Sequence, residues 1–138
     1  MTAKEYMKQA KILLKRIDRK RREAEDIRIR ESAPSSSSFS DMPKTVTHNP
    51  HQKSDNILRA IELDHEADIA FDELAKLKST FQESLQKIDN LDERDLMYKR
   101  YIEFKSWKNV ADEIGYSESH TKRIHALVVK KLILDDTQ

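Results

Sequence analysis

The chain has 138 residues, of which 37% are hydrophobic and another 37% are charged, with one glycine, three prolines and no cysteine. This length and composition suit one modest domain or two small units built from long helices, and they argue against a layered α/β fold. The absence of cysteine excludes a disulfide framework and a thiolate metal site. No apolar run approaches the ~20 residues of a membrane span and no signal-peptide core is seen, so we expect an intracellular, soluble, all-α protein.

The net charge of +1 hides a segregation along the chain. Residues 1–30 carry 11 Lys and Arg against 5 Asp and Glu, whereas residues 51–97 carry 6 against 12. Residues 98–138 carry 8 against 6. Segments of opposite sign are expected to pair with each other, but the basic segment would also suit nucleic acid, and charge alone does not decide between the two.

An amphipathic helix is predicted from Tyr6 to Ile27, where inward positions follow one another at spacings of four and three. Such a narrow stripe is typical of a coiled-coil-like seam. Its one charged member, Lys20, is expected to carry its ammonium out of the seam. The helix should end near Glu31, because Pro34 and the serines after it do not continue a helix cheaply. The seam positions are Tyr6, Ala10, Leu13, Ile17, Lys20, Ala24 and Ile27.

Residues 32–50 are rich in serine and proline and are interpreted as a linker or a long loop. A structureless loop of this length is unusual inside a compact domain, so we expect partial disorder, with Phe39 and Met42 as local anchors. Asn49 and Pro50 then supply an N-cap and a first-turn proline for the next helix.

A second, long helix is predicted because the rhythm of threes and fours resumes and persists. The simplest arrangement folds it against the first helix as an antiparallel hairpin over residues 1–90, which we interpret as an association module. Opposite charges favour this pairing, but exposed ion pairs contribute only ~0–1 kcal/mol each, so the apolar seam must dominate. The seam positions are Ala60, Leu63, Ala67, Ala70, Leu74, Leu77, Phe81, Ser84, Ile88 and Leu91.

A third unit is expected over residues 91–138, after a break in the rhythm at residues 89–92. It would begin with a short helix and a tight connection at Phe104 and Lys105, and Ser106 is placed to cap the helix that follows. The inward positions are Leu91, Leu96, Tyr101 and Ile102 in the first of these helices, and Trp107, Val110, Ala111 and Ile114 in the second.

The only glycine, Gly115, stands between this second helix and a final helix that Ser117 would cap. Glycine enters positive φ without steric cost, so a sharp turn is predicted here. A helix-turn-helix is a common way to place a helix in the major groove of DNA, and a plain helical hairpin is the structural alternative. The inward positions of the final helix are Thr121, Ile124, Leu127, Val128 and Leu132.

The inward set leaves a polar face near the start of the final helix, the end from which recognition helices read bases. There Ser119, His120, Lys122 and Arg123 are the candidate DNA-reading residues. The Ser117 hydroxyl and the first-turn amides are candidates to hold a phosphate, as are Lys105 and Lys108 near the start of the preceding helix.

Residues 91–132 resemble the carboxy-terminal helix-turn-helix of sigma factors, the part that reads the promoter −35 element. The resemblance is carried by Glu93-Arg94, Arg100-Tyr101, Ser106-Trp107, the run from Val110 to Ser117, and Lys130-Lys131-Leu132. The chain departs from that pattern at Thr121, where a valine is usual, and at His120, where a threonine is common. We expect the first departure to be tolerated in the core.

The whole chain resembles the RinA/ArpU-like family of phage late-gene transcription activators. This resemblance is carried by Thr2 to Tyr6, by Asp41-Met42-Pro43 and by Gly115-Tyr116-Ser117. It implies a phage or prophage regulator that acts on promoter DNA in the cytoplasm of a bacterial host. We expect a homodimer, with contact to RNA polymerase as a further possibility. The alternative is a helical interaction factor, such as an antirepressor or a polymerase-binding adaptor, whose sigma-like unit contacts protein.

Other polar clusters carry little chemistry. His48 and His51 are three residues apart but have no neighbouring cysteine, so we expect no metal site. His120 and His125 should point to different faces of one helix, and His65 should flank the second seam. The run Arg19-Lys20-Arg21-Arg22 either pairs with the acidic stretch from Glu62 to Glu73 or adds phosphate contacts. With no nucleophile–base pair and no phosphate-cradling glycine loop, we expect neither an enzyme nor a cofactor.

Overall fold

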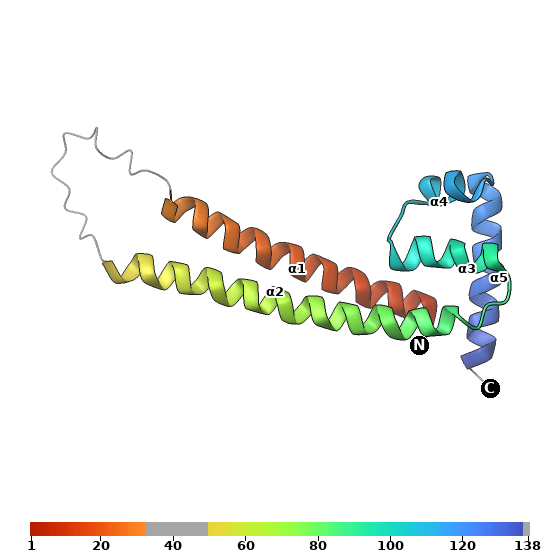
Figure 1. The fold of residues 1–138 in the computed structure, drawn as a ribbon, viewed down its shortest axis with the longest axis horizontal. Coiled ribbons are helices and arrows are strands. Elements are labelled where there is room, and N and C mark those ends of the chain that lie inside the picture. Colours follow the sequence, from red (N-terminus) through yellow and green to blue (C-terminus); the bar gives the residue numbers. More distant parts are fainter. Residues whose placement is uncertain (33–49, 137–138) are drawn as a thin grey trace. The chain divides into compact units, whose positions relative to one another are not determined.

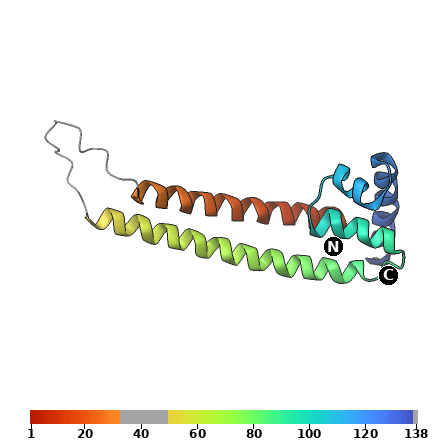
Figure 2. The same ribbon diagram turned by 45° about the horizontal axis from the view of Figure 1, so that its top comes forward.

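The computed structural model describes residues 1–32 and 50–136. Within these residues every regular element is helical and no strand occurs, so the expected all-α fold class is confirmed (Figures 1 and 2). Residues 33–49 of the predicted linker, which include Phe39, Met42, His48 and Asn49, lie outside the described residues, and Ser32 and Pro50 belong to helices. The elements are α1 (Ala3–Ser32), α2 (Pro50–Leu85), α3 (Leu91–Met97), the π-helical turn η2 (Tyr98–Ile102), α4 (Trp107–Ile114) and α5 (Glu118–Asp136).

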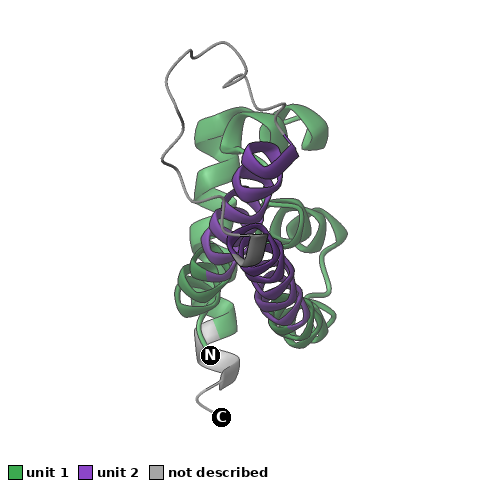
Figure 3. Cartoon of the chain, turned by 90° about the vertical axis from the view of Figure 1, so that its left-hand side faces the viewer, with its two compact units in different colours: residues 1–12, 73–138 green, residues 13–72 purple. Residues whose placement is uncertain are grey.

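The chain forms two compact units (Figure 3). One contains residues 1–12 together with 73–138, and the other contains residues 13–72. The units do not divide at residue 90, because the start of α1 and the end of α2 belong with the C-terminal helices. The separate roles predicted for residues 1–90 and 91–138 stay predictions.

Within residues 13–72, the two helical segments lie antiparallel. The Lys20 ammonium is 2.6 Å from a carboxylate oxygen of Glu66, and further along α1 the Glu31 carboxylate accepts a hydrogen bond of 2.7 Å from Asn56. Lys20 leaves the seam as expected, and its ammonium ends on a carboxylate at the seam edge. This hydrogen bond, with the charge of Lys20, lowers the pKa of Glu66.

Two further ion pairs join the helices in this unit, between Arg21 and Asp68 at 3.3 Å and between Arg28 and Asp64 at 2.6 Å. The predicted pairing of the basic and acidic segments is therefore present. All four of these side chains are at least a third exposed. The ion pairs therefore contribute little to stability, and they favour the pairing of these two helical segments. The stabilisation comes mainly from the buried seam, which includes Ala24, Ile27, Ala60 and Leu63.

The burial of the predicted seam positions agrees with the sequence, apart from one residue. All seven positions of α1 are buried or half-buried, and so are those of the second seam up to Ile88. The prediction for Leu91 is wrong, since its side chain is 73% exposed. The reason is that α2 ends at Leu85 and Leu91 opens α3, so the periodicity of α2 no longer sets its direction.

The break predicted at residues 89–92 starts α3, with Asn90 as its N-cap. The Asn90 side-chain oxygen accepts hydrogen bonds from the backbone amides of Asp92 and Glu93, at 2.9 and 3.2 Å. This satisfies two of the amides that a helix start leaves free.

A chain of aromatic contacts forms the core of the unit made by residues 1–12 and 73–138. Tyr6 stacks on Phe81 with ring centroids 4.0 Å apart, and Phe81 in turn lies 5.3 Å from Tyr101. The Tyr6 hydroxyl donates a hydrogen bond of 2.9 Å to the backbone carbonyl of Tyr101. Burial raises the pKa of Tyr6 to about 12. The first turns of α1 are thereby packed against the residues that lead into α4.

Candidate nucleic-acid interface

Helix α4 is short because both of its ends are capped. Ser106 is extended, and its hydroxyl accepts a hydrogen bond of 3.2 Å from the amide of Asn109. Val110 and Ala111 are fully or almost fully buried on its inner face. At its other end, Gly115 adopts the left-handed conformation with φ 88°, as predicted. The amides of Gly115 and Tyr116 both donate to the carbonyl of Ala111, at 2.9 and 3.1 Å.

Helix α5 starts at Glu118, three residues after Gly115, with Ser117 as its cap. The Ser117 hydroxyl accepts a hydrogen bond of 3.1 Å from the amide of His120. Its carbonyl accepts bonds from the amide and the hydroxyl of Thr121, at 2.9 and 2.8 Å. Thr121 is fully buried, and its hydroxyl is satisfied by this contact, which is why a polar residue fits the core here.

The inner face of α5 differs from the prediction at one position. Thr121 and Val128 are buried, and Ile124 and Leu132 are half-buried, as expected. Leu127 was expected inside and is instead 59% exposed. At about 100° per residue, Leu127 lies roughly 120° around the helix from Thr121, whereas Val128 returns to within about 20° of it.

The polar face predicted for α5 is exposed. Ser119, His120, Lys122 and Arg123 are all exposed in the first two turns of the helix. Ser119 and Arg123, four residues apart, share one face, and Lys122 and His120 flank it. The side chains of Ser119 and Arg123 make no hydrogen bond or ion pair with any described residue, whereas the Lys122 ammonium lies 3.4 Å from Glu118.

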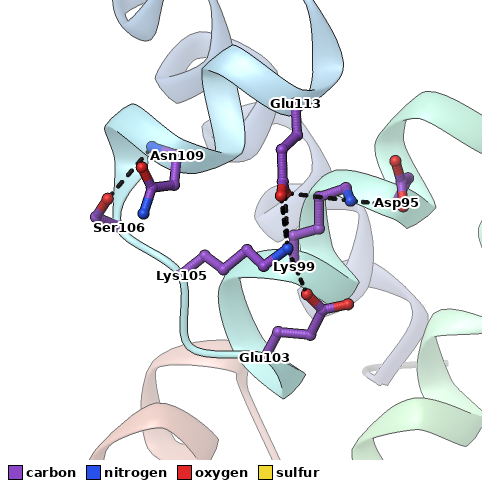
Figure 4. A network of polar contacts seen from close by, with 7 residues as sticks. All are labelled: Asp95, Lys99, Glu103, Lys105, Ser106, Asn109 and Glu113. Atoms are coloured by element: carbon purple, nitrogen blue, oxygen red, sulfur yellow. Dashed lines mark hydrogen bonds and ion pairs between the residues drawn. The ribbon is translucent and has the colours of Figure 1, made fainter.

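The other predicted site residues lie around α4, in different situations. Lys108 is exposed on α4 and forms no ion pair within the described chain. Lys105 is tied down, because its ammonium lies 2.8 Å from Glu103 and 2.7 Å from Glu113 (Figure 4). The hydrogen bonds to Glu103 and then Glu113 raise the pKa of Lys105, and the bond from Lys105 lowers the pKa of Glu113. A phosphate contact by Lys105 would therefore compete with two carboxylates.

Two contacts that the sequence analysis missed hold the turn between α4 and α5. The Tyr116 hydroxyl donates a hydrogen bond of 3.1 Å to Asp92 at the start of α3, and this bond raises the pKa of Tyr116. The ring of Tyr116 meets that of His120 edge-on, with centroids 5.0 Å apart. His120 thus has a fixed neighbour beside the exposed face. The tyrosine was visible in the sequence, but nothing there indicated its partners.

An aromatic and cationic stack supports the back of α5. The His125 ring lies between Tyr101 and Trp107, with centroids 5.6 and 4.7 Å away, and its Nε2 is hydrogen-bonded to the Tyr101 hydroxyl. The Arg100 guanidinium lies 4.6 Å from the Trp107 ring centroid. Burial, and then the charge of Arg100, lower the pKa of His125. As predicted, His120 and His125 point to different faces.

The described residues suggest neither a metal centre nor a membrane segment. Across residues 1–32 and 50–136, no group of three or more His, Cys, Asp or Glu side chains is placed to hold a metal ion. None of the helices in that part of the chain is both long and apolar enough to cross a bilayer. His48, considered as a ligand above, lies outside the described residues, and the side chain of its neighbour His51 is also outside them.

Comparison of the chain with models of protein families, with curated proteins and with solved structures gives no match. The function of the chain is therefore inferred from its own residues and geometry.

Proposed function

We propose that the chain is a sequence-specific DNA-binding transcription regulator of a phage or prophage, an activator of late-gene transcription. The observation that carries the proposal is the uncovered polar face at the start of α5, directly after a left-handed glycine turn. A helix that enters the major groove needs its N-terminal side chains free on one side and a packed core on the other. Thr121 and Val128 supply that core.

In this proposal the residues have different roles. Arg123 and Ser119 read base edges, with Lys122 and His120 beside them. Lys108 and Ser117 contact the phosphate backbone and set the register of α5 on the duplex. Lys105 joins them once the duplex phosphates replace its carboxylate partners. The arrangement of α3, α4 and α5 would then serve as a sigma-like module for a promoter element.

We propose that α1 and α2 act as a hairpin that associates the regulator, either with a second copy or with RNA polymerase. A symmetric dimer would bind two half-sites and so double the phosphate contacts available to a small module. Footprinting on DNA from the neighbourhood of its own gene would report both occupancy and half-site spacing.

The proposal is tested by replacing Arg123 and Lys122 separately with alanine and measuring affinity for the footprinted site. Each lost base contact should weaken specific binding by about 1–3 kcal/mol and relax the sequence preference at the contacted position. Lys76→Ala is a matched control, because Lys76 is an exposed cation on α2 with no ion pair among the described residues. Unchanged affinity in both α5 variants would refute their assignment.

The second candidate is a protein-interaction factor whose α4–α5 unit binds protein. The modest charge of this region favours it, since residues 105–131 carry 6 Lys and Arg against 3 Asp and Glu. A salt titration separates the two functions. Binding through several phosphates weakens steeply as salt is added, whereas an apolar protein interface responds little.

A further inference from the structure

Eight of the eleven Lys and Arg residues of α1 fall into two sets that the linear sequence does not separate. Lys20, Arg21 and Arg28 turn toward α2 and form the ion pairs described above. A second set recurs at spacings of four, three, four and four on the outward side of the helix. This set, called the basic stripe here, consists of Lys4, Lys8, Lys11, Lys15 and Arg19.

The basic stripe is exposed and uncompensated. All five side chains are exposed, and none forms an ion pair with the described part of the chain. At about 100° per residue they fall within an arc of roughly 80°, opposite the seam. All five belong to the single helix α1 (Ala3–Ser32), so the helix itself sets their spacing.

Carboxylates are scarce beside Lys4 to Lys15 and occur beside the end of the stripe, where Asp18, Glu23 and Asp26 line a surface hollow together with Lys15 and Arg19. Before Asp18 the chain has one acidic residue, Glu5, whose side chain accepts a hydrogen bond of 3.1 Å from the Thr2 amide in a capping box. Asp18 pairs with Arg22 instead, at 3.1 Å. From Lys4 to Lys15 the stripe therefore presents positive charge over about 16 Å of helix with no acidic residue on the same side, at 1.5 Å per residue.

We propose that the basic stripe is a second DNA-binding surface, which holds the phosphate backbone of duplex DNA without reading its sequence. This inference rests on the DNA-binding function proposed above and adds a site that the α4–α5 unit does not contain. A duplex carries a phosphate charge every ~1.7 Å of its axis, so a stripe of this length meets many phosphates.

The chemistry of the stripe favours DNA over other anionic partners. A helix that lies on an anionic membrane inserts an apolar face, and the apolar face of α1 is buried in the seam. A protein partner would be expected to fill the centre of the surface with apolar or aromatic anchors. The stripe has none, and Ile12 beside it is only half exposed, at 49%.

The test compares two triple variants that remove the same charge. One is Lys8→Gln, Lys11→Gln and Lys15→Gln in the stripe. The other is Lys53→Gln, Lys76→Gln and Lys87→Gln, three exposed lysines with no ion pair among the described residues. Binding to a random-sequence duplex is measured by fluorescence anisotropy between about 50 and 200 mM salt.

We expect the stripe variant to flatten the plot of log affinity against log salt by about 2.7, or about 0.9 for each lost phosphate contact. The control variant should keep the wild-type slope, and circular dichroism should show both variants fully helical. Equal slopes in the two triple variants would overturn the inference. The inference would also be overturned if the stripe variant kept the wild-type salt slope and instead changed the sedimenting mass of the free protein. A changed retention on anionic vesicles with an unchanged salt slope would overturn it in the same way.

The failure of this inference is distinguishable from the failure of the proposed function. The stripe variant should weaken binding to promoter and random duplexes by the same factor, whereas Arg123→Ala should lower their ratio. If the wild-type protein binds no duplex, both proposals are overturned. If the wild-type protein binds a duplex and the stripe variant binds it equally well, only the inference about the basic stripe is overturned.

Discussion

Two residues of the unit built from residues 1–12 and 73–138 have left-handed backbones, for different reasons. Gly115 has φ 88° and ends α4. Phe104 has φ 57°, an unusual value for a bulky side chain. Its conformation is held by surrounding contacts, since the Lys78 ammonium lies 5.0 Å from its ring centroid and the next carbonyl, of Lys105, accepts a bond of 2.9 Å from Arg100. Only the glycine was predictable from residue type.

The backbone cost of a side chain at position 115 can be measured without a steric clash. A Cβ added there would meet no atom within 4 Å, so Gly115→Ala pays only for its left-handed backbone. We expect it to lower the free energy of unfolding by about 1–2 kcal/mol. Gly115→Asn should cost less, because asparagine tolerates this conformation. Urea unfolding of both variants checks the ranking, and an alanine variant as stable as the wild type would contradict a backbone cost at this position.

At the scale of single elements, the two sides of α5 differ in character. Its outer side carries the proposed DNA-reading residues, and its inner side carries His125 in the stack with Tyr101 and Trp107. The orientation of the outer side depends on this packing. A change that disturbs the stack should therefore alter the orientation of the proposed DNA-binding face, although it changes none of the residues on that face.

The protonation of His125 supplies such a change. Its pKa is lowered in the folded protein, so the unfolded chain binds more protons just below the ordinary value of about 6.5. The contribution of His125 to the free energy of unfolding should then be complete above about pH 6.5. It should be lost as the pH is lowered through the folded pKa. Urea unfolding from pH 7.5 to 5, followed by Trp107 fluorescence, should show this loss, and His125→Gln should reduce it. A pH dependence identical in both proteins would contradict the prediction.

Carboxylates do not explain a loss in this range. The pKa values of Glu66 and Glu113 are lowered in the folded protein, so their contribution is present above their ordinary value of about 4.5 and is lost only below it. The two effects therefore occupy different pH windows.

At the scale of the whole molecule, the start of the chain supports its end. Tyr6 is fully buried and reaches Phe81 by stacking and Tyr101 by a hydrogen bond. A fragment restricted to residues 91–138 would lack both Tyr6 and Phe81. The DNA-binding unit proposed from sequence is thus structurally incomplete without distant parts of the chain.

This dependence predicts the effect of Tyr6→Ala. Truncating a fully buried aromatic ring should cost about 3–5 kcal/mol, and Tyr6→Phe, which loses only the hydrogen bond, about 1 kcal/mol. Trp107 is the only tryptophan, so its fluorescence during urea unfolding reports on the C-terminal helices. Ile12→Ala, at a half-exposed position of α1, is the control. If Tyr6→Ala leaves the urea unfolding transition of Trp107 fluorescence unchanged, the coupling between Tyr6 and the C-terminal helices is refuted.

Much of the architecture was predictable because periodicity records which side of a helix is buried. The seam of α1, the start of α2 at Pro50, the caps at Ser106 and Ser117 and the turn at Gly115 agree with the sequence analysis. Leu91 was predicted wrongly because the periodicity of α2 was extended past the end of that helix. Leu127 was predicted wrongly because it lies one residue away from the buried face of α5. The exposure of the four α5 candidates was also predictable, as the complement of its core.

The sequence by itself determined the helices, their inner faces and the glycine turn, because these depend on neighbours within about four residues along the chain. Only the tertiary structure decided which charged side chains have ion-pair partners. It pairs Lys20 with Glu66 and Lys105 with Glu103 and Glu113, and it leaves Arg123 and the basic stripe without carboxylate partners among the described residues. It also joins Tyr6 to Tyr101. The physical reason is that an ion pair or a stack depends on which side chains are brought within a few ångströms, and a linear pattern of charges does not contain that distance.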